Sequence, residues 1–372
     1  MSEGLPDSGR REKSPPVLRT ETRTEHRSIS PWDSPDPPRR VLLIRLHALG
    51  DVALVLPAAA HLVRRWPGAS FDLLTAPPAD SLAEITGLFR SVLRLPSASG
   101  PLARFVGAIR MGLSLRRRKY DLTIDLQRNR LSRIIRILSG APAWSEFDRF
   151  SPLPAHQRVL STLSLAGIAR AAHEIPVPCP EAPLSRGRRV LEEAGWDGST
   201  RLVVFNPAGI WVTRNWPLSR YVELYRLWSM REPVRILVLG TDRMTEKGRY
   251  FALEGGMDVI NLAGRTTPGE AFAVLRHASV IVSEDSGLMH MAWAAGLPIV
   301  ALFGSTRSDW SAPQGDRAVC LDSADLECGC CMEPACRFSD VHCLTRRTAQ
   351  EVLDATLDLL ARIHTQSQEQ HP

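Results

Sequence analysis

A turn of small and polar residues in the second half of the chain has the composition of an anion-binding site. Residues 280–295 (VIVSEDSGLMHMAWAA) predict a strand, a short turn and a helix. Free N–H groups and a positive dipole end at the helix start would suit a diphosphate, and His290 could reach the same anion. A structural interpretation stays open, in which Asp285 or Ser286 only caps the helix and His290 only packs.

Other phosphate-binding signatures are missing from the sequence. It contains no G-x-G, which argues against a dinucleotide-binding enzyme, and no Walker A sequence, which argues against a P-loop enzyme. It also contains no D-x-D, the usual metal clamp for a sugar diphosphate. A leaving diphosphate would therefore depend on Arg, Lys, His or helix ends, and we predict no catalytic metal site for it.

Apolar runs alternate with stretches of helical spacing along most of the chain, which predicts parallel α/β sheets. The first helix is predicted to end at Trp66, with Pro57 near its start. The pattern restarts after residues 176–184 (PVPCPEAPL), whose four prolines oppose a helix and favour a linker. Two units of similar size predict two doubly wound domains that face each other. The predicted strands are residues 41–46, 71–75, 91–95, 122–126, 202–205, 234–239, 258–262, 280–283 and 299–303.

These patterns set the expected domain boundaries. Residues 1–38 are rich in Pro, Ser and mixed charge and are predicted to form a disordered, dispensable tail. The remaining boundaries are an N-terminal domain at 39–175, the linker at 176–184, a C-terminal domain at 185–345, a C-terminal helix at 346–364 and a tail at 365–372.

Composition narrows the class of protein. Hydrophobic residues make up 44% and charged residues 23%, which suits a soluble globular protein. No apolar run is long enough to span a membrane, and the N-terminal segment lacks the apolar core of a secretory signal. We therefore expect a cytoplasmic protein without disulfides.

The net charge of +6 favours anionic partners. A basic cluster at residues 116–119 (RRRK), together with Arg128, Arg130, Arg133 and Arg136, has two interpretations: a solvated helix face, or contact with a phosphorylated glycolipid or anionic membrane. We expect no nucleic-acid partner, because no nucleic-acid motif accompanies the charge.

Six of the seven cysteines lie between Cys320 and Cys343. Cys328 and Cys331 have the spacing of metal ligands, but a second pair with that spacing is absent. A structural metal, structural thiols and a redox-sensitive loop all stay open for this segment.

Four segments together resemble glycosyltransferase family 9, the heptosyltransferase family of lipopolysaccharide core assembly. They occur in the family's order and spacing and cover residues from about 40 to 363. The segments are residues 41–51 (VLLIRLHALGD), 120–127 (YDLTIDLQ), 206–209 (NPAG) with 214–217 (RNWP), and 285–290 (DSGLMH) with 303–306 (FGST).

This resemblance implies a GT-B fold, in which two Rossmann-like domains flank an interdomain cleft. The donor nucleotide would lie on the C-terminal domain and the acceptor on the N-terminal one. The family's proposed general base corresponds to Asp51, which should lie just past the first strand, where open α/β sheets place their ligands. Asp51 would take the acceptor proton during a single inverting displacement, which needs no nucleophilic carboxylate. A helix cap is the alternative role for Asp51.

The resemblance also assigns the donor site. Arg214 stands where many relatives have Lys before Trp-Pro and would hold the donor phosphates. Asp285 would lie near the donor sugar, and Asp242 near the ribose. The other expected donor-binding residues are Asn206, Gly209, Ser286, Gly287 and His290, and the expected acceptor residues are Arg128 and Arg130.

The implied function is transfer of heptose from ADP-heptose, without a cofactor, to a lipopolysaccharide-core-like or other cell-envelope glycan. Such an enzyme would work in the cytoplasm or on the cytoplasmic face of the inner membrane. Two alternatives stay open: use of another nucleoside diphosphate sugar or a non-lipopolysaccharide acceptor, and a catalytically silent protein that binds a sugar nucleotide or glycan.

Overall fold

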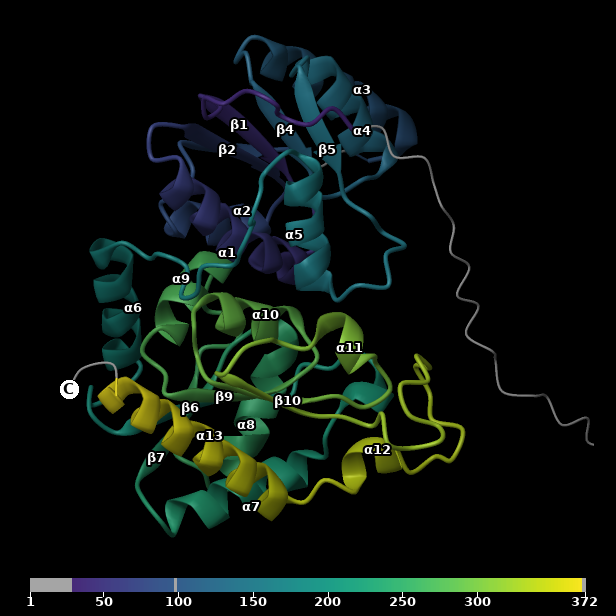
Figure 1. Ribbon diagram of the computed structural model, residues 1–372. Helices are drawn as coiled ribbons and strands as arrows, with labels where there is room; N and C mark the ends of the chain where they lie inside the picture. Colours follow the sequence, from purple (N-terminus) through teal and green to yellow (C-terminus); the bar gives the residue numbers. More distant parts are fainter. Residues whose placement is uncertain (1–28, 97–98, 370–372) are drawn as a thin grey trace, which may run out of the picture.

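The computed structural model describes residues 29–96 and 99–369, which form two parallel sheets with helices on both faces of each (Figure 1). The first sheet has the order β3-β2-β1-β4-β5 and the second β11-β10-β9-β6-β7-β8. The strands of the first sheet are β1 (Arg40–Ile44), β2 (Ser70–Thr75), β3 (Ser91–Arg94), β4 (Leu122–Asp125) and β5 (Ala143–Glu146). Those of the second are β6 (Arg201–Asn206), β7 (Val234–Val238), β8 (Val259–Asn261), β9 (Val280–Glu284), β10 (Ile299–Leu302) and β11 (Ala318–Leu321).

The apolar runs form the central strands because both faces of a parallel sheet are covered. Residues 41–44 of β1 and all of β9 are buried, and each strand pairs on both sides. The predicted α/β class, with two doubly wound units, is therefore confirmed. All carboxyl ends within one sheet point to the same edge, so the loops after β1, β6 and β9 can build a site.

Helices on the inner faces join the two halves. Helix α1 packs against α10, and α2 packs against α9, so one apolar core runs through both halves. Figure 1 shows α3 at the end of the molecule away from the second sheet. The helices of the first half are α1 (Leu49–Arg65), α2 (Ala79–Ile85), α3 (Pro101–Arg116), α4 (Arg130–Ser139) and α5 (Ala155–Leu165). Those that follow are α6 (Glu181–Glu193), α7 (Leu218–Ser229), α8 (Thr245–Leu253), α9 (Pro268–Leu275), α10 (Gly287–Ala294), α11 (Ser308–Ser311), α12 (His342–Thr345) and α13 (Ala349–Glu369), with the 3₁₀ turns η1 (Val212–Arg214) and η2 (Asp242–Met244).

Three helix boundaries differ from the prediction. Helix α6 begins at Glu181, so residues 181–184 of the expected linker are helical; Pro183 is tolerated there because the first turn of a helix needs no N–H donors. Pro57 lies inside α1 rather than near its start, since the buried apolar face outweighs one missing hydrogen bond. Helix α13 continues to Glu369, so the segment predicted as a tail from residue 365 is helical that far.

The expected tail is also wrong for residues 29–38, while residues 1–28 lie outside the described part. Ser30 pairs with Trp144 of β5 through two backbone hydrogen bonds of 3.0 and 2.7 Å. The Trp32 amide donates to the Ala166 carbonyl at 2.9 Å, and its side chain packs on the main core. A single half-buried tryptophan can anchor a polar segment that has no apolar periodicity.

We expect Trp32→Ala to lower the free energy of unfolding by about 1–3 kcal/mol, because truncating a fully buried tryptophan costs about 3–5 and Trp32 is half-buried. Urea unfolding followed by circular dichroism measures the change. Trp310→Ala is the matched control, since that ring is exposed beside Arg307. Equal stability of both variants would show that residues 29–38 are a dispensable tail after all.

Candidate active site

Asp51 lies in the first turn of α1, directly after the loop that follows β1. Its Oδ2 accepts a hydrogen bond from the Ala48 amide at 3.3 Å and forms an ion pair with Arg45, yet 42% of its side chain is exposed. Arg45 is itself held by the Leu126 carbonyl and the face of the Phe147 ring, 5.3 Å away. The Ala48 amide and Arg45 thus orient the carboxylate, while part of it stays accessible to solvent, as a general base must be.

The N-terminus of α10 has the construction that the sequence predicted. Ser286 is the N-cap, and its Oγ accepts from the Met289 amide at 3.4 Å. Asn206, the last residue of β6, donates from Nδ2 to the hydroxyls of Ser286 and Ser283, both at 2.7 Å. Gly287 opens the helix, so its backbone is free to approach an anion at the positive end of the dipole.

Arg214 lies at the end of η1 and points to the same turn. It forms an ion pair with the Asp285 carboxylate at 2.7 Å and donates to the Asp285 carbonyl at 2.5 Å. Both contacts use one terminal nitrogen, while Nε is buried without a hydrogen-bond partner among the described residues. The guanidinium, 5.6 Å from the Trp211 ring centroid, therefore keeps donor capacity for a phosphate.

His290 connects the two halves of the site. It is buried, and burial lowers its pKa, against the opposing effect of the Asp285 and Asp51 carboxylates. A neutral imidazole can donate one hydrogen bond, and Nδ1 has no partner within the described chain. A Cβ at Gly50 would lie 2.9 Å from His290 Cδ2 and 3.1 Å from Gly287 Cα, so Gly50 permits the close approach of α1 and α10. Asp51 is thereby placed beside the predicted anion site.

Glu284 was not predicted as a site residue, yet it organises the loop that carries Arg214. Its buried carboxylate accepts from the amides of Gly209 and Trp216, each at 2.7 Å. Burial raises the pKa of Glu284 to about 7, and the two amides oppose that shift. Gly209 is required here because a Cβ would lie 2.6 Å from the Arg214 carbonyl oxygen. A carboxylate at the end of an apolar strand was the available sequence signal.

Sequence analysis also did not predict Lys247 of α8 as a site residue. Its ammonium group donates to the Pro207 carbonyl and, at 3.3 Å, to Asn215 Oδ1. Asp242 precedes α8 in η2, is exposed, and follows β7 at the carboxyl edge of the second sheet. No hydrogen bond or ion pair in the described ranges joins Asp242 to the other predicted donor residues, so its ribose role stays a prediction.

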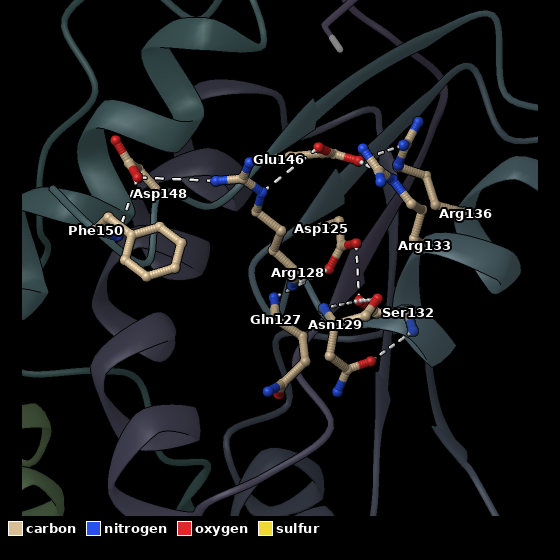
Figure 2. A network of polar contacts seen from close by, with 10 residues as sticks. All are labelled: Asp125, Gln127, Arg128, Asn129, Ser132, Arg133, Arg136, Glu146, Asp148 and Phe150. Atoms are coloured by element: carbon tan, nitrogen blue, oxygen red, sulfur yellow. Dashed lines mark hydrogen bonds and ion pairs between the residues drawn. The ribbon is translucent and has the colours of Figure 1, made fainter. Parts of the chain in front are cut away.

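The two predicted acceptor residues differ in their surroundings. Figure 2 shows the Arg128 guanidinium between Glu146 and Asp148, with Nε 3.7 Å from the Glu146 carboxylate and Nη1 3.8 Å from the Asp148 carboxylate. Only 12% of its side chain is exposed. Arg130 begins α4 and is exposed.

Arg158 of α5 is a cation close to Asp51 that sequence analysis did not predict. It lies over the Phe147 ring at 5.8 Å, on which Arg45 also lies. Burial lowers the pKa of Arg158, and the Asp51 and Asp148 carboxylates oppose that shift. Phe147 therefore carries two guanidinium groups close to the candidate base.

The cysteine segment, residues 320–343, contacts the turn that carries Arg214, because the Thr213 hydroxyl donates to the Glu333 carbonyl at 2.6 Å. Cys328 Sγ is 3.2 Å from His342 Nε2, and His342 Nδ1 is 2.9 Å from Asp340 Oδ1. Burial raises the pKa of Cys343 to about 11, so it stays a thiol at neutral pH. All seven cysteines are free, and no three His, Cys, Asp or Glu side chains of residues 29–96 and 99–369 are placed to share a metal ion.

A family profile and two sequence relatives agree on one family. The profile of glycosyltransferase family 9 (heptosyltransferase) matches residues 108–342. Lipopolysaccharide heptosyltransferase 1 of Pseudomonas aeruginosa is 28% identical over 80% of this chain and 88% of that protein. Lipopolysaccharide heptosyltransferase 2 of Salmonella typhimurium is 27% identical over 75% and 86% of the two chains.

Solved structures have the same arrangement of domains. A family 9 glycosyl transferase from Veillonella parvula superposes with a TM-score of 0.75 at 18% identity, covering 87% of this chain and 97% of that one. The ADP-heptose lps heptosyltransferase II of E. coli gives a TM-score of 0.68 at 21% identity, with 87% and 99% covered. The predicted GT-B fold is confirmed by these neighbours and by the two parallel sheets.

Proposed function

The chain belongs to glycosyltransferase family 9, and from this premise we propose that it transfers heptose from ADP-heptose to a lipopolysaccharide-core-like or other cell-envelope glycan. The observation that carries the proposal is the meeting of two helix starts: Asp51 at the start of α1 and the Ser286–Gly287 turn of α10, with His290 between them. The lipopolysaccharide heptosyltransferases among its relatives support the choice of sugar and acceptor.

The chemistry proceeds as one displacement with inversion. The acceptor hydroxyl oxygen attacks the anomeric carbon as Asp51 takes its proton, and the bond from that carbon to the diphosphate oxygen breaks. Negative charge grows on the leaving ADP. Arg214, the His290 ring N–H and the amides at the start of α10 receive that charge, and their fixed positions avoid reorganisation during the reaction.

The test is incubation with ADP-heptose and a heptose-deficient lipopolysaccharide core, with ADP release and the mass of the acceptor as readouts. We expect ADP release that depends on the acceptor and a mass gain of one heptose. Donor binding without ADP release would favour the catalytically silent alternative. Turnover with another nucleoside diphosphate sugar only, or with a non-lipopolysaccharide acceptor only, would support the other alternative.

We further propose that catalysis needs no metal ion. The sequence lacks D-x-D, and Arg214, His290 and a helix N-terminus supply positive charge and N–H donors to the diphosphate. Turnover should be unchanged within about twofold in excess EDTA. Loss of activity in EDTA that Mg²⁺ or Mn²⁺ restores would contradict this assignment of the leaving-group site.

A lipid-linked acceptor would also require work at the membrane surface. No helix of the described residues is both long and apolar enough to cross a bilayer. We propose peripheral contact with the cytoplasmic face of the inner membrane, because an anionic membrane surface attracts a chain with a net charge of +6.

A further inference from the structure

Helix α3 carries a second apolar stripe besides the one that packs on the protein. Ala108, Gly112 and Leu115 are buried on the side of α3 that contacts α4. Leu102 is 76% exposed, and Leu113 is 50% exposed. The stripe consists of Leu102, Phe105, Val106, Ile109 and Leu113. Its members follow Leu102 or one another by three, four or seven residues, and this spacing places all five on one face of the helix.

A basic cavity lies at the end of this stripe. Arg117 follows Leu113 by four residues, so the two share a face of the helix. Arg117 also lines a cavity of about 270 Å³ at the amino edge of the first sheet, opposite to the Asp51 edge. The cavity is lined by the arginines Arg40, Arg90, Arg117 and Arg118, with Asp72 and Tyr120 at its base.

The charges in the cavity do not cancel. Asp72 Oδ2 accepts hydrogen bonds from Arg118 Nη1 at 2.9 Å and from the Tyr120 hydroxyl at 2.6 Å. Arg40 donates to the Arg118 carbonyl at 2.7 Å. The exposed side chains of Arg90 and Arg117 have no hydrogen bond or ion pair with any described residue, so two guanidinium groups remain for an anion. Two guanidinium groups that line the same cavity suit a phosphate.

We propose that the α3 stripe and the arginine cavity together form a docking surface for an anionic phospholipid membrane. The stripe would enter the boundary between headgroups and acyl chains, while Arg90 and Arg117 bind a lipid phosphate. An apolar stripe alone would suit a second protein chain. The stripe is continuous with a cavity that holds two arginines without partners among the described residues, and this favours an occupant whose surface is both apolar and anionic. The inference deepens the proposed membrane contact and rests on it for the choice of partner. The docking surface is tested by vesicle binding without substrate, so this inference can fail while the proposed sugar transfer is still supported.

The experiment is co-sedimentation of the full chain with phosphatidylcholine vesicles that do or do not contain phosphatidylglycerol. We expect binding to the anionic vesicles that falls as salt is raised. Arg90→Ser with Arg117→Ser should weaken this binding about tenfold or more, since each arginine near such a surface contributes about fivefold. Leu102→Ser with Phe105→Ser should also weaken it about tenfold or more, through lost apolar burial.

Two control pairs match these changes in chemistry but lie in the second half. Arg186→Ser with Arg189→Ser removes two exposed arginines of α6, and Met230→Ser with Leu253→Ser removes two exposed apolar side chains. Both should bind vesicles like the native chain, and all four variants should keep its melting temperature. The proposal is overturned if the stripe and cavity variants bind like the controls. It is also overturned if light scattering shows that the native chain is a dimer and the stripe variant is a monomer. Binding of soluble glycerol phosphate to the cavity, without binding of the chain to vesicles, would overturn it as well.

Discussion

Asp51→Asn is expected to bind ADP almost normally and to transfer sugar roughly 10²–10⁴ times more slowly, the usual contribution of a positioned general base. The amide has nearly the size of the carboxylate but cannot accept the acceptor proton. Arg45 keeps its bond to the Leu126 carbonyl and its contact with Phe147, so the local structure should persist. Calorimetry with ADP and steady-state rates with both substrates measure the two effects.

The matched control is Asp121→Asn at the opposite edge of the same sheet. The Asp121 carboxylate accepts from the amides of Arg39 and Arg40 at 2.8 and 2.9 Å, much as Asp51 accepts from Ala48. That variant should keep both ADP binding and turnover. If Asp51→Asn instead loses ADP binding at an unchanged melting temperature, Asp51 belongs to the donor site. Near-normal turnover would show that the base lies elsewhere.

The strands at the centre of each sheet could be predicted because burial on both faces leaves an uninterrupted apolar run. Strand β1 and strand β9 are examples, and the structure confirms both. The edge strand β5 could not be predicted: it has four residues, and Ser145 and Glu146 are buried polar side chains. Its place depends on pairing with β4 and on the contact of Arg136 with Glu146, which only the folded chain brings together.

The site shows the same division. The Ser286–Gly287 turn could be found because strand, turn and helix follow one another in sequence. Lys247 acts across the fold on the Pro207 carbonyl, and no local pattern marks it. Glu284 binds the amides of Gly209 and Trp216, which are distant in sequence, and its only local signal is a carboxylate at the end of an apolar strand. Arg45 did leave a signal, because a charged residue inside a buried apolar run requires a partner. That partner is Asp51, six residues later.

Arg214→Ala is expected both to weaken ADP binding and to lower turnover, in contrast with Asp51→Asn. Arg214 would contact the diphosphate before and during bond breaking, and the charge on the leaving phosphate grows in the transition state. Loss of one such donor costs roughly 10²–10³-fold in turnover. Arg214→Lys keeps the charge without the planar fork, so we expect it to recover much of the binding but less of the rate.

Arg307→Ala is the control for the loss of a paired, ring-stacked arginine. Arg307 forms an ion pair with Asp309 and lies 4.4 Å from the Trp310 ring centroid, as Arg214 pairs with Asp285 and lies beside Trp211. Its removal should leave ADP binding and turnover unchanged. If Arg214→Ala lowers the melting temperature while Arg214→Lys retains native binding and rate, charge alone is sufficient at this position. If Arg214→Ala binds ADP like the native chain, Arg214 serves only to hold Asp285, and the diphosphate must depend on His290 and the start of α10.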